Sequence, residues 1–342
     1  STCNCIYITG QFGGGAATFG FAGTLYSFGG VDAFIAKMDL NGNFIWVNKI
    51  GGPGYDFTRL YSGINNNLYL ISHTTDSCYF GGFHLPSGGS ISRFDTNGVC
   101  TMAKIYYSFP NSNSNQISLG FIKNDLLIHG YFNSNPFLID TSHIQNKGNY
   151  DALLARADSN GNIKWIKSFG NSGLDAFQSI AVDDSNYIYV SGVFTDSIDL
   201  GGIKIYNNGP DNLYAKFDEN GNPVWARQTH ATGSIQGAAQ ILKDKNGNCY
   251  FTGIFSGSAN FGGNLISSIS AKDAFLTRYT NNGDCMGVIN FGEANTPNIA
   301  LDNQGFLYAA GQFKNTLNLG STTMSSIGGY DLYIAKHSAI QA

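Results

Sequence analysis

Five aspartates recur at one position of a repeating pattern, and their carboxylates are the first groups in this chain that could do chemistry. Each stands at the start of a short apolar run such as Asp32-Ala33-Phe34-Ile35. A ring of carboxylates could bind a metal ion or a cationic ligand, but aspartate at a loop end also caps backbone N–H groups of that loop. Because a ligand site usually breaks the symmetry of a repeat, we favour the structural role. The five are Asp32, Asp151, Asp211, Asp273 and Asp331.

A second aspartate pattern suggests calcium binding. Turns of the form Asp39-Leu40-Asn41-Gly42-Asn43 recur along the chain, and alternate oxygen ligands suit a hard cation. However, these turns lack the bidentate glutamate that closes a calcium loop, and Thr280 replaces the aspartate in one copy without disturbing the pattern. Asn-Gly between alternating runs is typical of a tight hairpin, since both residues accept positive φ. We therefore expect hairpin turns, no metal site and no cofactor.

The sequence contains no recognisable motif for nucleophilic catalysis or phosphate binding. The six histidines show no paired helical spacing, no Gly-x-Ser-x-Gly occurs, and Gly13-Gly14-Gly15 opens no helix as a phosphate loop must. No catalytic residue is assigned. Paired carboxylates for glycoside cleavage meet only in space, so an enzyme acting on polysaccharides stays open as an alternative.

Residues 173–225 contain the elements that must position these side chains. They hold an apolar run (177–182), an alternating run (187–192), a long polar loop, a third run (211–217) and a last run through Trp225. Four short runs rich in β-branched and aromatic residues, each bounded by Gly, Asn, Asp or Ser, predict four antiparallel strands. The pattern recurs six times at a spacing of about 60 residues. A four-stranded sheet repeated along a chain is the sequence form of a β-propeller.

We therefore predict an all-β chain, a six-bladed β-propeller of four-stranded antiparallel blades, formed as a single domain by residues 1–342. The second and third strands occur six times, but the first and fourth occur five times each, because the chain opens at a second strand and stops at a third. One blade is then incomplete or shared between the termini. Either the chain is trimmed, or the gap is tolerated, or another chain adds strands at the open edge.

The motifs taken together resemble a known repeat family. They run from Phe19-Gly20 through the strand 32–37, the turn 41–43 and Trp46 to the Gly-rich stretch 51–56. This series resembles the SBBP (beta-propeller repeat) family over nearly the whole chain. The resemblance implies a propeller fold and a bacterial secreted or cell-surface protein, and the family has no shared catalytic residues. The second copy departs from the pattern, because it lacks the aspartate and tryptophan positions.

Tryptophan occurs once in several fourth strands, and we expect a structural role for it. A buried indole at a repeated position packs between neighbouring blades, with its N–H bonded to a carbonyl oxygen. The three residues are Trp46, Trp165 and Trp225.

The cysteine positions argue against most disulfide pairings. Cys5 and Cys249 share one repeat position, as do Cys100 and Cys285. The members of each pair therefore fall in different blades, beyond the limit of roughly 7 Å between Cα atoms that a disulfide allows. Cys249 and Cys285 share a blade, but the third strand separates them. We expect none of these combinations to form a disulfide.

Composition excludes two classes of partner. Charged residues make up 12% of the chain, the formal net charge is -4, and no Lys/Arg run occurs, so there is no electrostatic footprint for nucleic acid or an anionic membrane. No apolar run reaches the roughly 20 residues of a spanning helix, so we expect no membrane insertion. Loops rich in Asn, Ser, Thr and Gly suit an extracellular or cell-surface location.

The candidate ligand-binding residues lie in the long loops. In a propeller with this strand order, the loop between the second and third strands and the loop between blades open on one face, where loops vary on a rigid scaffold. Aromatic rings there can stack on a sugar, while amides and carboxylates bond its hydroxyl groups. The six candidates are Tyr55, Asp56, Asp175, Tyr206, Asn207 and His230.

These observations lead to three hypotheses of function. The first is a non-catalytic extracellular or cell-surface binding or adhesion module, with a glycan or a surface protein as its partner. The second is a polysaccharide-active enzyme that uses carboxylates around a central channel. The third is a structural protein that self-assembles through the open edge of the incomplete blade.

Overall fold

The computed structural model describes residues 4–108, 116–133, 137–139, 142–233, 235–319 and 322–337. This part of the chain is built from β-strands, with two short 3-10 turns, η1 (Gly20–Ala22) and η2 (Ile64–Asn66), and no α-helix. No helix there is long and apolar enough to cross a membrane. The predicted all-β class is confirmed.

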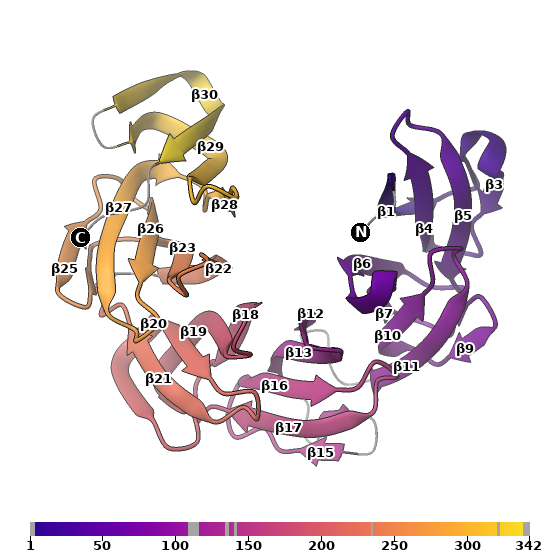
Figure 1. Ribbon diagram of the computed structural model, residues 1–342, viewed down its shortest axis with the longest axis horizontal. Helices are drawn as coiled ribbons and strands as arrows, with labels where there is room; N and C mark the ends of the chain where they lie inside the picture. Colours follow the sequence, from indigo (N-terminus) through magenta and orange to yellow (C-terminus); the bar gives the residue numbers. More distant parts are fainter. Residues whose placement is uncertain are drawn as a thin grey trace. The chain divides into compact units, whose positions relative to one another are not determined.

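We group the main strands into antiparallel sheets A to F in chain order (Figure 1). Sheet A contains β1 (Cys5–Gly13), β4 (Val31–Asp39) and β5 (Phe44–Gly51). Sheet B contains β6 (Asp56–Ser62), β7 (Leu68–Thr74), β10 (Gly88–Phe94) and β11 (Cys100–Ser108). Sheet C contains β12 (Gln116–Ile122), β13 (Asp125–Phe132), β16 (Asp151–Ala157) and β17 (Ile163–Phe169).

Sheet D contains β18 (Ala176–Val182), β19 (Ile188–Asp199), β20 (Lys204–Phe217) and β21 (Pro223–Gln228). Sheet E contains β22 (Ile235–Lys243), β23 (Cys249–Phe255), β26 (Asp273–Tyr279) and β27 (Cys285–Ala294). Sheet F contains β28 (Asn298–Leu301), β29 (Leu307–Leu319) and β30 (Thr322–His337). Sheets B to E have the predicted order of first to fourth strand. Within the described ranges sheet A lacks a first strand and sheet F a fourth, as the strand count predicts.

The segment between the second and third strands is a β-ribbon, where the sequence suggested a long polar loop. Four ribbons are separate pairs of short strands. In sheets D and F the ribbon is instead an extension of the second and third strands, and in sheet D it places Ser197 opposite Tyr206. At the ribbon tips Phe80 and Phe261 are buried, and the glycine after each takes a φ of 59° that favours glycine. Burial of this residue explains why an apolar-Gly pair recurs. The separate pairs are β2 (Ala16–Thr18) with β3 (Thr24–Tyr26), β8 (Cys78–Phe80) with β9 (Phe83–Leu85), β14 (Phe137–Ile139) with β15 (Ser142–Ile144), and β24 (Ser258–Phe261) with β25 (Asn264–Ser267).

Two ribbons also cover an edge of the preceding sheet. Strand β8 pairs with β5, with Phe80 opposite Ile50, and β29 pairs with β27, with Leu317 opposite Gly292. A free outer strand would offer unpaired N–H and C=O groups to other chains. The ribbons therefore protect part of the outer edges of sheets A and E.

The chain divides into two compact units, and we describe each by itself. Unit 1 comprises residues 1–127, 134–145 and 156–166. In it sheet A packs face to face on sheet B through a buried apolar cluster that includes Ala33, Ile35, Leu68 and Leu70. Alternate residues along each strand point to one face, so every second residue of β4 contributes to this contact. The single domain over residues 1–342 stays a prediction.

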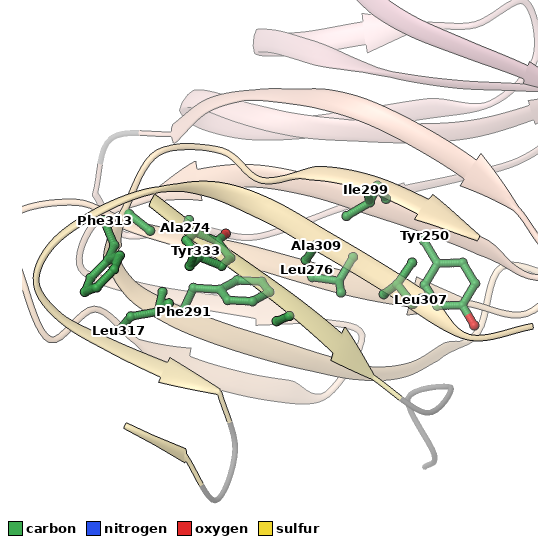
Figure 2. Close-up of a cluster of buried hydrophobic side chains, with 12 residues drawn as sticks. Tyr250, Ala274, Leu276, Phe291, Ile299, Leu307, Ala309, Phe313, Leu317 and Tyr333 are labelled. Carbon is green, nitrogen blue, oxygen red and sulfur yellow. The ribbon is translucent and has the colours of Figure 1, made fainter. Parts of the chain in front are cut away.

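Unit 2 comprises residues 128–133, 146–155 and 167–342, and in it sheet E is covered on both faces. Phe251 and Phe275 of sheet E pack with Tyr214 of sheet D. On the other face Leu276 and Tyr250 pack against residues of sheet F, as Figure 2 shows. Strand β26 is buried at every residue as a result. Successive sheets are thus stacked, which removes apolar area from water on both sides.

Tryptophan and lysine side chains add polar bonds between successive sheets. The indole N–H of Trp46 and the Nζ of Lys37 both donate to the carbonyl oxygen of Thr96, in the turn of the next sheet. Trp225 bonds the carbonyl oxygen of Asn281 at 3.0 Å, and Lys216 also donates to Asn281. These contacts between neighbouring sheets are the ones that the sequence predicts for Trp46 and Trp225.

The cysteines follow the predicted geometry. Cys249 and Cys285 both lie opposite Tyr279, one on each side of strand β26, and both thiols are free, as are those of Cys78 and Cys100. Cys5 is disulfide-bonded. The excluded pairings therefore do not form.

Candidate functional site

The side chain of Gln228, the last residue of strand β21, holds Tyr206 of the sheet D ribbon. Gln228 Nε2 donates to the carbonyl oxygen of Tyr206 at 3.1 Å, and the same nitrogen lies 3.0 Å from Nδ1 of His230. The side chain of Tyr206 is 67% exposed, and His230 is exposed as well. We call Tyr206, Gln228 and His230 the Tyr206 cluster. Its backbone is held in place while its ring faces solvent, so little ordering is needed when a ligand stacks on the ring.

The donors of Gln228 determine the tautomer of His230. A primary amide has two N–H donors; here one meets the carbonyl of Tyr206 and the other meets Nδ1 of His230. A flipped amide would place its oxygen against that carbonyl, which is also an acceptor. Nδ1 therefore accepts, and the neutral imidazole carries its proton on Nε2. The cluster thus presents an N–H donor, the amide oxygen of Gln228 and a phenol to solvent.

His230 takes a backbone conformation that favours glycine. Its φ is 45°, and its N–H donates to Oδ2 of Asp211 at 2.8 Å. The same repeat position, five residues after the fourth-strand tryptophan, holds Gly51 and Gly170. A left-handed conformation costs a non-glycine residue about 1–2 kcal/mol, and such strain collects at functional sites. This outlier directs attention to the Tyr206 cluster.

The backbone anchor of Tyr206 occurs in two other sheets. Lys49 Nζ donates to the carbonyl oxygen of Tyr26 at 3.1 Å, and Asn290 Nδ2 donates to that of Ser267 at 3.0 Å. Lys49, Gln228 and Asn290 occupy one position of the fourth strand, opposite Phe34, Leu213 and Phe275 respectively. The sequence analysis missed this anchor because its donors are three different residue types. Its signal is a polar residue three places after the tryptophan in sheets A and D, and Asn290 holds the same position in sheet E, where Gly287 replaces the tryptophan.

The version in unit 1 also exposes aromatic rings. Tyr26 is 69% and Phe28 58% exposed. The Lys49 ammonium lies 5.5 Å from the centre of the Phe28 ring, within the range of a cation–π contact. Tyr55 is 57% exposed, and its backbone forms an isolated bridge with Val31. Unit 1 therefore carries its own anchored aromatic group.

The six residues that the sequence suggested for ligand binding have different positions. Tyr206 and His230 meet through Gln228, and Asn207, next in the chain, is half-buried. Tyr55 lies apart from them, in unit 1. Asp56 and Asp175 are buried, with 1% and 0% of their surfaces exposed, and are not positioned to meet a ligand at the surface. Their position after a glycine-rich loop suggested exposure, but tertiary packing covers them.

The five recurrent aspartates cap loops in the way that the structural interpretation predicts. Four of them accept the backbone N–H of the residue four places earlier. Asp211 accepts instead from the N–H groups of Asn212 and His230. Asp331, which accepts the N–H of Ile327, is half-buried, and the other four aspartates are fully buried.

The Asp-Asn-Gly turns use their carboxylates internally. In the first of them, Asp39 Oδ1 accepts the N–H groups of Asn41 and Asn43, and Oδ2 accepts the Asn43 amide. Asp158 and Asp218 repeat the arrangement. In sheet E the Thr280 hydroxyl takes the place of the carboxylate. Across the described residues no group of three or more His, Cys, Asp or Glu side chains could hold a metal ion.

Two surface hollows lie at the tight turns, where the sequence analysis expected no site. One of about 600 Å³ in unit 1 is lined by Tyr7, Lys37 and Asn66 among others. Another of about 440 Å³ in unit 2 is lined by residues that include Lys243 and Asp302. In the second hollow, Asp244 and Arg278 form an ion pair at 3.2 Å. The carboxylates of Asp244 and Asp302 are also bonded within their own turns.

Comparison with known proteins assigns the chain to no family. No protein-family model matches the chain, and no curated protein matches it. Among solved structures, the crystal structure of a protein of unknown function from Bacteroides caccae is 12% identical, with a TM-score of 0.41 over 80% of each chain. The Dos1 propeller is 10% identical, with a TM-score of 0.44 over 89% of this chain and 74% of that one. Neither likeness decides a family or a function.

Proposed function

We propose that this chain is a non-catalytic binding module of an extracellular or cell-surface protein, and that it binds glycans through anchored aromatic side chains. The observation that carries the proposal is the Tyr206 cluster, in which Gln228 bonds both the Tyr206 backbone and His230. A saccharide needs a flat apolar surface for its ring and directional partners for its hydroxyl groups. The Tyr206 ring, the Nε2 proton of His230 and the Gln228 amide oxygen supply these within one cluster.

We further propose that the sheets are blades of a six-bladed β-propeller of the SBBP repeat type. The support is internal. The strand order within sheets B to E is that of a propeller blade, and sheet E packs on a neighbouring sheet through each face. In this fold the anchored residues Tyr26, Tyr206 and Ser267 lie at one repeat position of three different blades.

A glycan array tests the binding proposal. The purified chain, Tyr206→Ala and Tyr330→Ala are applied to the same polysaccharides, and the wells are assayed for released sugar. Tyr330 is the matched control, because its ring is 62% exposed in the same unit but lies outside the cluster. An aromatic contact contributes about 0.5–1.5 kcal/mol, so Tyr206→Ala should lower affinity between about twofold and tenfold, while Tyr330→Ala leaves it unchanged. Equal binding by both variants contradicts the proposal, and sugar release supports the polysaccharide-active enzyme.

A second candidate function, self-assembly, is favoured by the outer face of sheet F. Leu332 and Ile334 of β30 are 77% and 81% exposed. Their equivalents in sheet E, Ala274 and Leu276, are fully buried against the next sheet. Light scattering of the chain and of a Leu332→Asp, Ile334→Asp variant over a range of concentrations tests this function. Self-assembly is supported if the parent chain associates and the variant does not. It is contradicted if the parent chain is a monomer at every concentration.

A further inference from the structure

Two pairs of buried aspartates meet at equivalent points in the two units. In unit 1 they are Asp32, at the start of β4, and Asp56, at the start of β6. In unit 2 they are Asp151, at the start of β16, and Asp175, just before β18. All four side chains are at most 1% exposed. Each pair joins the third strand of one sheet to the segment that enters the next.

Both carboxylates of each pair lie beside one short segment that contains a glycine. This segment is residues 51–52 in unit 1 and residues 170–171 in unit 2. A methyl group placed on Gly170 would lie 2.7 Å from Asp175 Oδ2 and 2.8 Å from Asp151 Oδ1. At the equivalent Gly51 a methyl group would lie 1.7 Å from Asp32 Oδ1. Only glycine at these positions leaves room for the carboxylates. In unit 2 the carboxylates of Asp151 and Asp175 both approach the place where a side chain at residue 170 would begin.

Every member of a pair has one bonded and one unbonded oxygen. Oδ2 of Asp56 accepts the N–H of Gly52 at 2.9 Å, and Oδ2 of Asp175 accepts that of Asn171 at 3.0 Å. Oδ2 of Asp32 and of Asp151 likewise accepts one backbone N–H each. The Oδ1 atom of all four is buried without a hydrogen-bond partner. An unpaired buried acceptor costs about 1–3 kcal/mol.

The other sheets supply the internal control. In sheets D and E the buried aspartate of the recurrent position has no second aspartate beside it. There both oxygens of the carboxylate accept hydrogen bonds. Asp211 Oδ1 and Oδ2 accept two backbone N–H groups. Asp273 accepts from the backbone of Ile269 and Ser270 and from the Asn290 amide. Among the described buried carboxylates, oxygens without a hydrogen bond of normal geometry occur only where two aspartates meet. The Thr195 backbone N–H lies near Asp175 and the Cys78 thiol near Asp56, but neither makes such a bond to Oδ1.

We propose that each pair binds one proton, which forms a hydrogen bond between the two carboxylates of the pair and ties successive sheets together. One proton added to a dicarboxylate turns two unsatisfied acceptors into a donor and an acceptor, and it halves the buried charge. No other atom is transferred. The proton comes from solvent and returns to it when the pair ionises.

The charged groups around the pairs agree with this protonation. Asp56 faces Asp32, Asp76 and the thiol of Cys78, and burial, with the charge of Asp32 as a smaller cause, raises its pKa to about 6. Asp175 faces Asp151 and Asp196, and burial followed by the charge of Asp151 raises its pKa to about 7. Burial also raises the pKa of Asp151, which Lys147 partly offsets. In each pair the charge of one carboxylate thus favours the protonated form of the other.

The expected effect on stability has a definite sign. A carboxyl group whose pKa is raised in the folded state holds its proton there at pH values where the unfolded chain has released it. Its stabilising contribution is complete below the unfolded value of about 3.8 and is lost as the pH rises through about 6 for Asp56 and about 7 for Asp175. The two pairs together make the protein less stable at pH 8 than at pH 5.

The test compares urea unfolding from pH 4.5 to pH 9 for the parent chain and for Asp56→Asn, Asp175→Asn and the double variant. An asparagine amide supplies the donor permanently, so the unfolding midpoint of the double variant should stay constant where that of the parent falls. Asp76→Asn and Asp196→Asn remove neighbouring exposed charges and are the matched controls; both should keep the parent's profile. A double variant with the same decline as the parent overturns the proposal.

Direct titration decides the matter if the variants do not fold. Carboxyl-carbon NMR of the parent chain labelled at aspartate should show one proton taken up per pair near neutral pH, in two sites that shift together. Titration of all four groups below pH 5 overturns the proposal. A rise in the parent's unfolding midpoint on adding Ca²⁺ at pH 8, absent from the double variant, would show that the unbonded oxygens hold a cation and also overturns it.

Discussion

Gln228 Nε2 lies 3.1 Å from the carbonyl oxygen of Tyr206, and this bond fixes the position of an exposed ring without touching the ring itself. Lys49 and Asn290 make the corresponding bond in sheets A and E. The anchor therefore belongs to the scaffold, while the residue that it holds differs from sheet to sheet. A repeat of this kind can change its ligand without changing its fold.

Removal of the anchor should weaken binding more than it weakens the fold. Gln228→Ala deletes one bond to a carbonyl at the surface, which costs about 0.5–1.5 kcal/mol of unfolding free energy, and it frees both Tyr206 and His230. We expect a loss of glycan affinity comparable to that of Tyr206→Ala. Urea unfolding and binding are measured on the same samples. The control Gln304→Ala alters another exposed glutamine of the same unit and should leave binding intact.

His230→Gly should not destabilise the protein, although it removes a large side chain. Relief of the left-handed conformation gains about 1–2 kcal/mol, and the added freedom of glycine in the unfolded chain offsets about 0.4–1 kcal/mol of that. The opposite change, Gly292→Ala in sheet E, should destabilise, because Gly292 has a φ of 78° and a methyl group there would lie 2.9 Å from the Thr316 carbonyl oxygen. Urea unfolding of the two variants should give opposite signs. A clear loss of stability in His230→Gly would show that the imidazole has a structural role.

The turn aspartates should control stability in acid. Burial raises the pKa of Asp158 and Asp218, but the N–H groups of their own turns lower it more, so each pKa lies below the ordinary value of 3.8. A lowered folded-state pKa stabilises above the unfolded value, and that stabilisation is lost as the pH falls through the folded one. The unfolding midpoint of the parent should therefore drop steeply below about pH 4. Asp158→Asn and Asp218→Asn should flatten this drop, whereas Asp184→Asn, at an exposed position, should not.

The buried thiols should be unreactive until the chain unfolds. Cys78 and Cys249 have no exposed surface, and burial raises the pKa of both thiols far above the ordinary value. The half-buried Cys100 has its pKa raised by burial to about 11. Since the thiolate is the reactive form, Ellman's reagent should label neither Cys78 nor Cys249 in the native protein. In denaturant the four free cysteines should all react. Rapid native labelling of Cys249 would contradict the packing of sheets D and E.

The sequence determined much of the fold because its signals are local and repeated. Alternation of apolar residues in short runs, with Asp-Asn-Gly turns between them, was enough to predict the antiparallel strands and their order within sheets B to E. It also predicted that, within the described residues, sheet A has no first strand and sheet F no fourth. The same logic placed Trp46 and Trp225 between sheets, because a large residue repeated in the fourth strand has to be packed.

The tertiary structure decided what depends on the distance between segments remote in sequence. Asp56 and Asp175 follow glycine-rich loops and so suggested an exposed site, but the neighbouring sheet buries them beside Asp32 and Asp151. The polar loop between the second and third strands folds as a ribbon, and an apolar residue at its tip, such as Phe80 or Phe261, is buried. The anchor of Tyr206 was invisible in the sequence, since a bond to a backbone carbonyl accepts lysine, glutamine or asparagine equally well. Burial and hydrogen bonds to the backbone do not require one particular residue type. They can therefore be read only from the packed sheets.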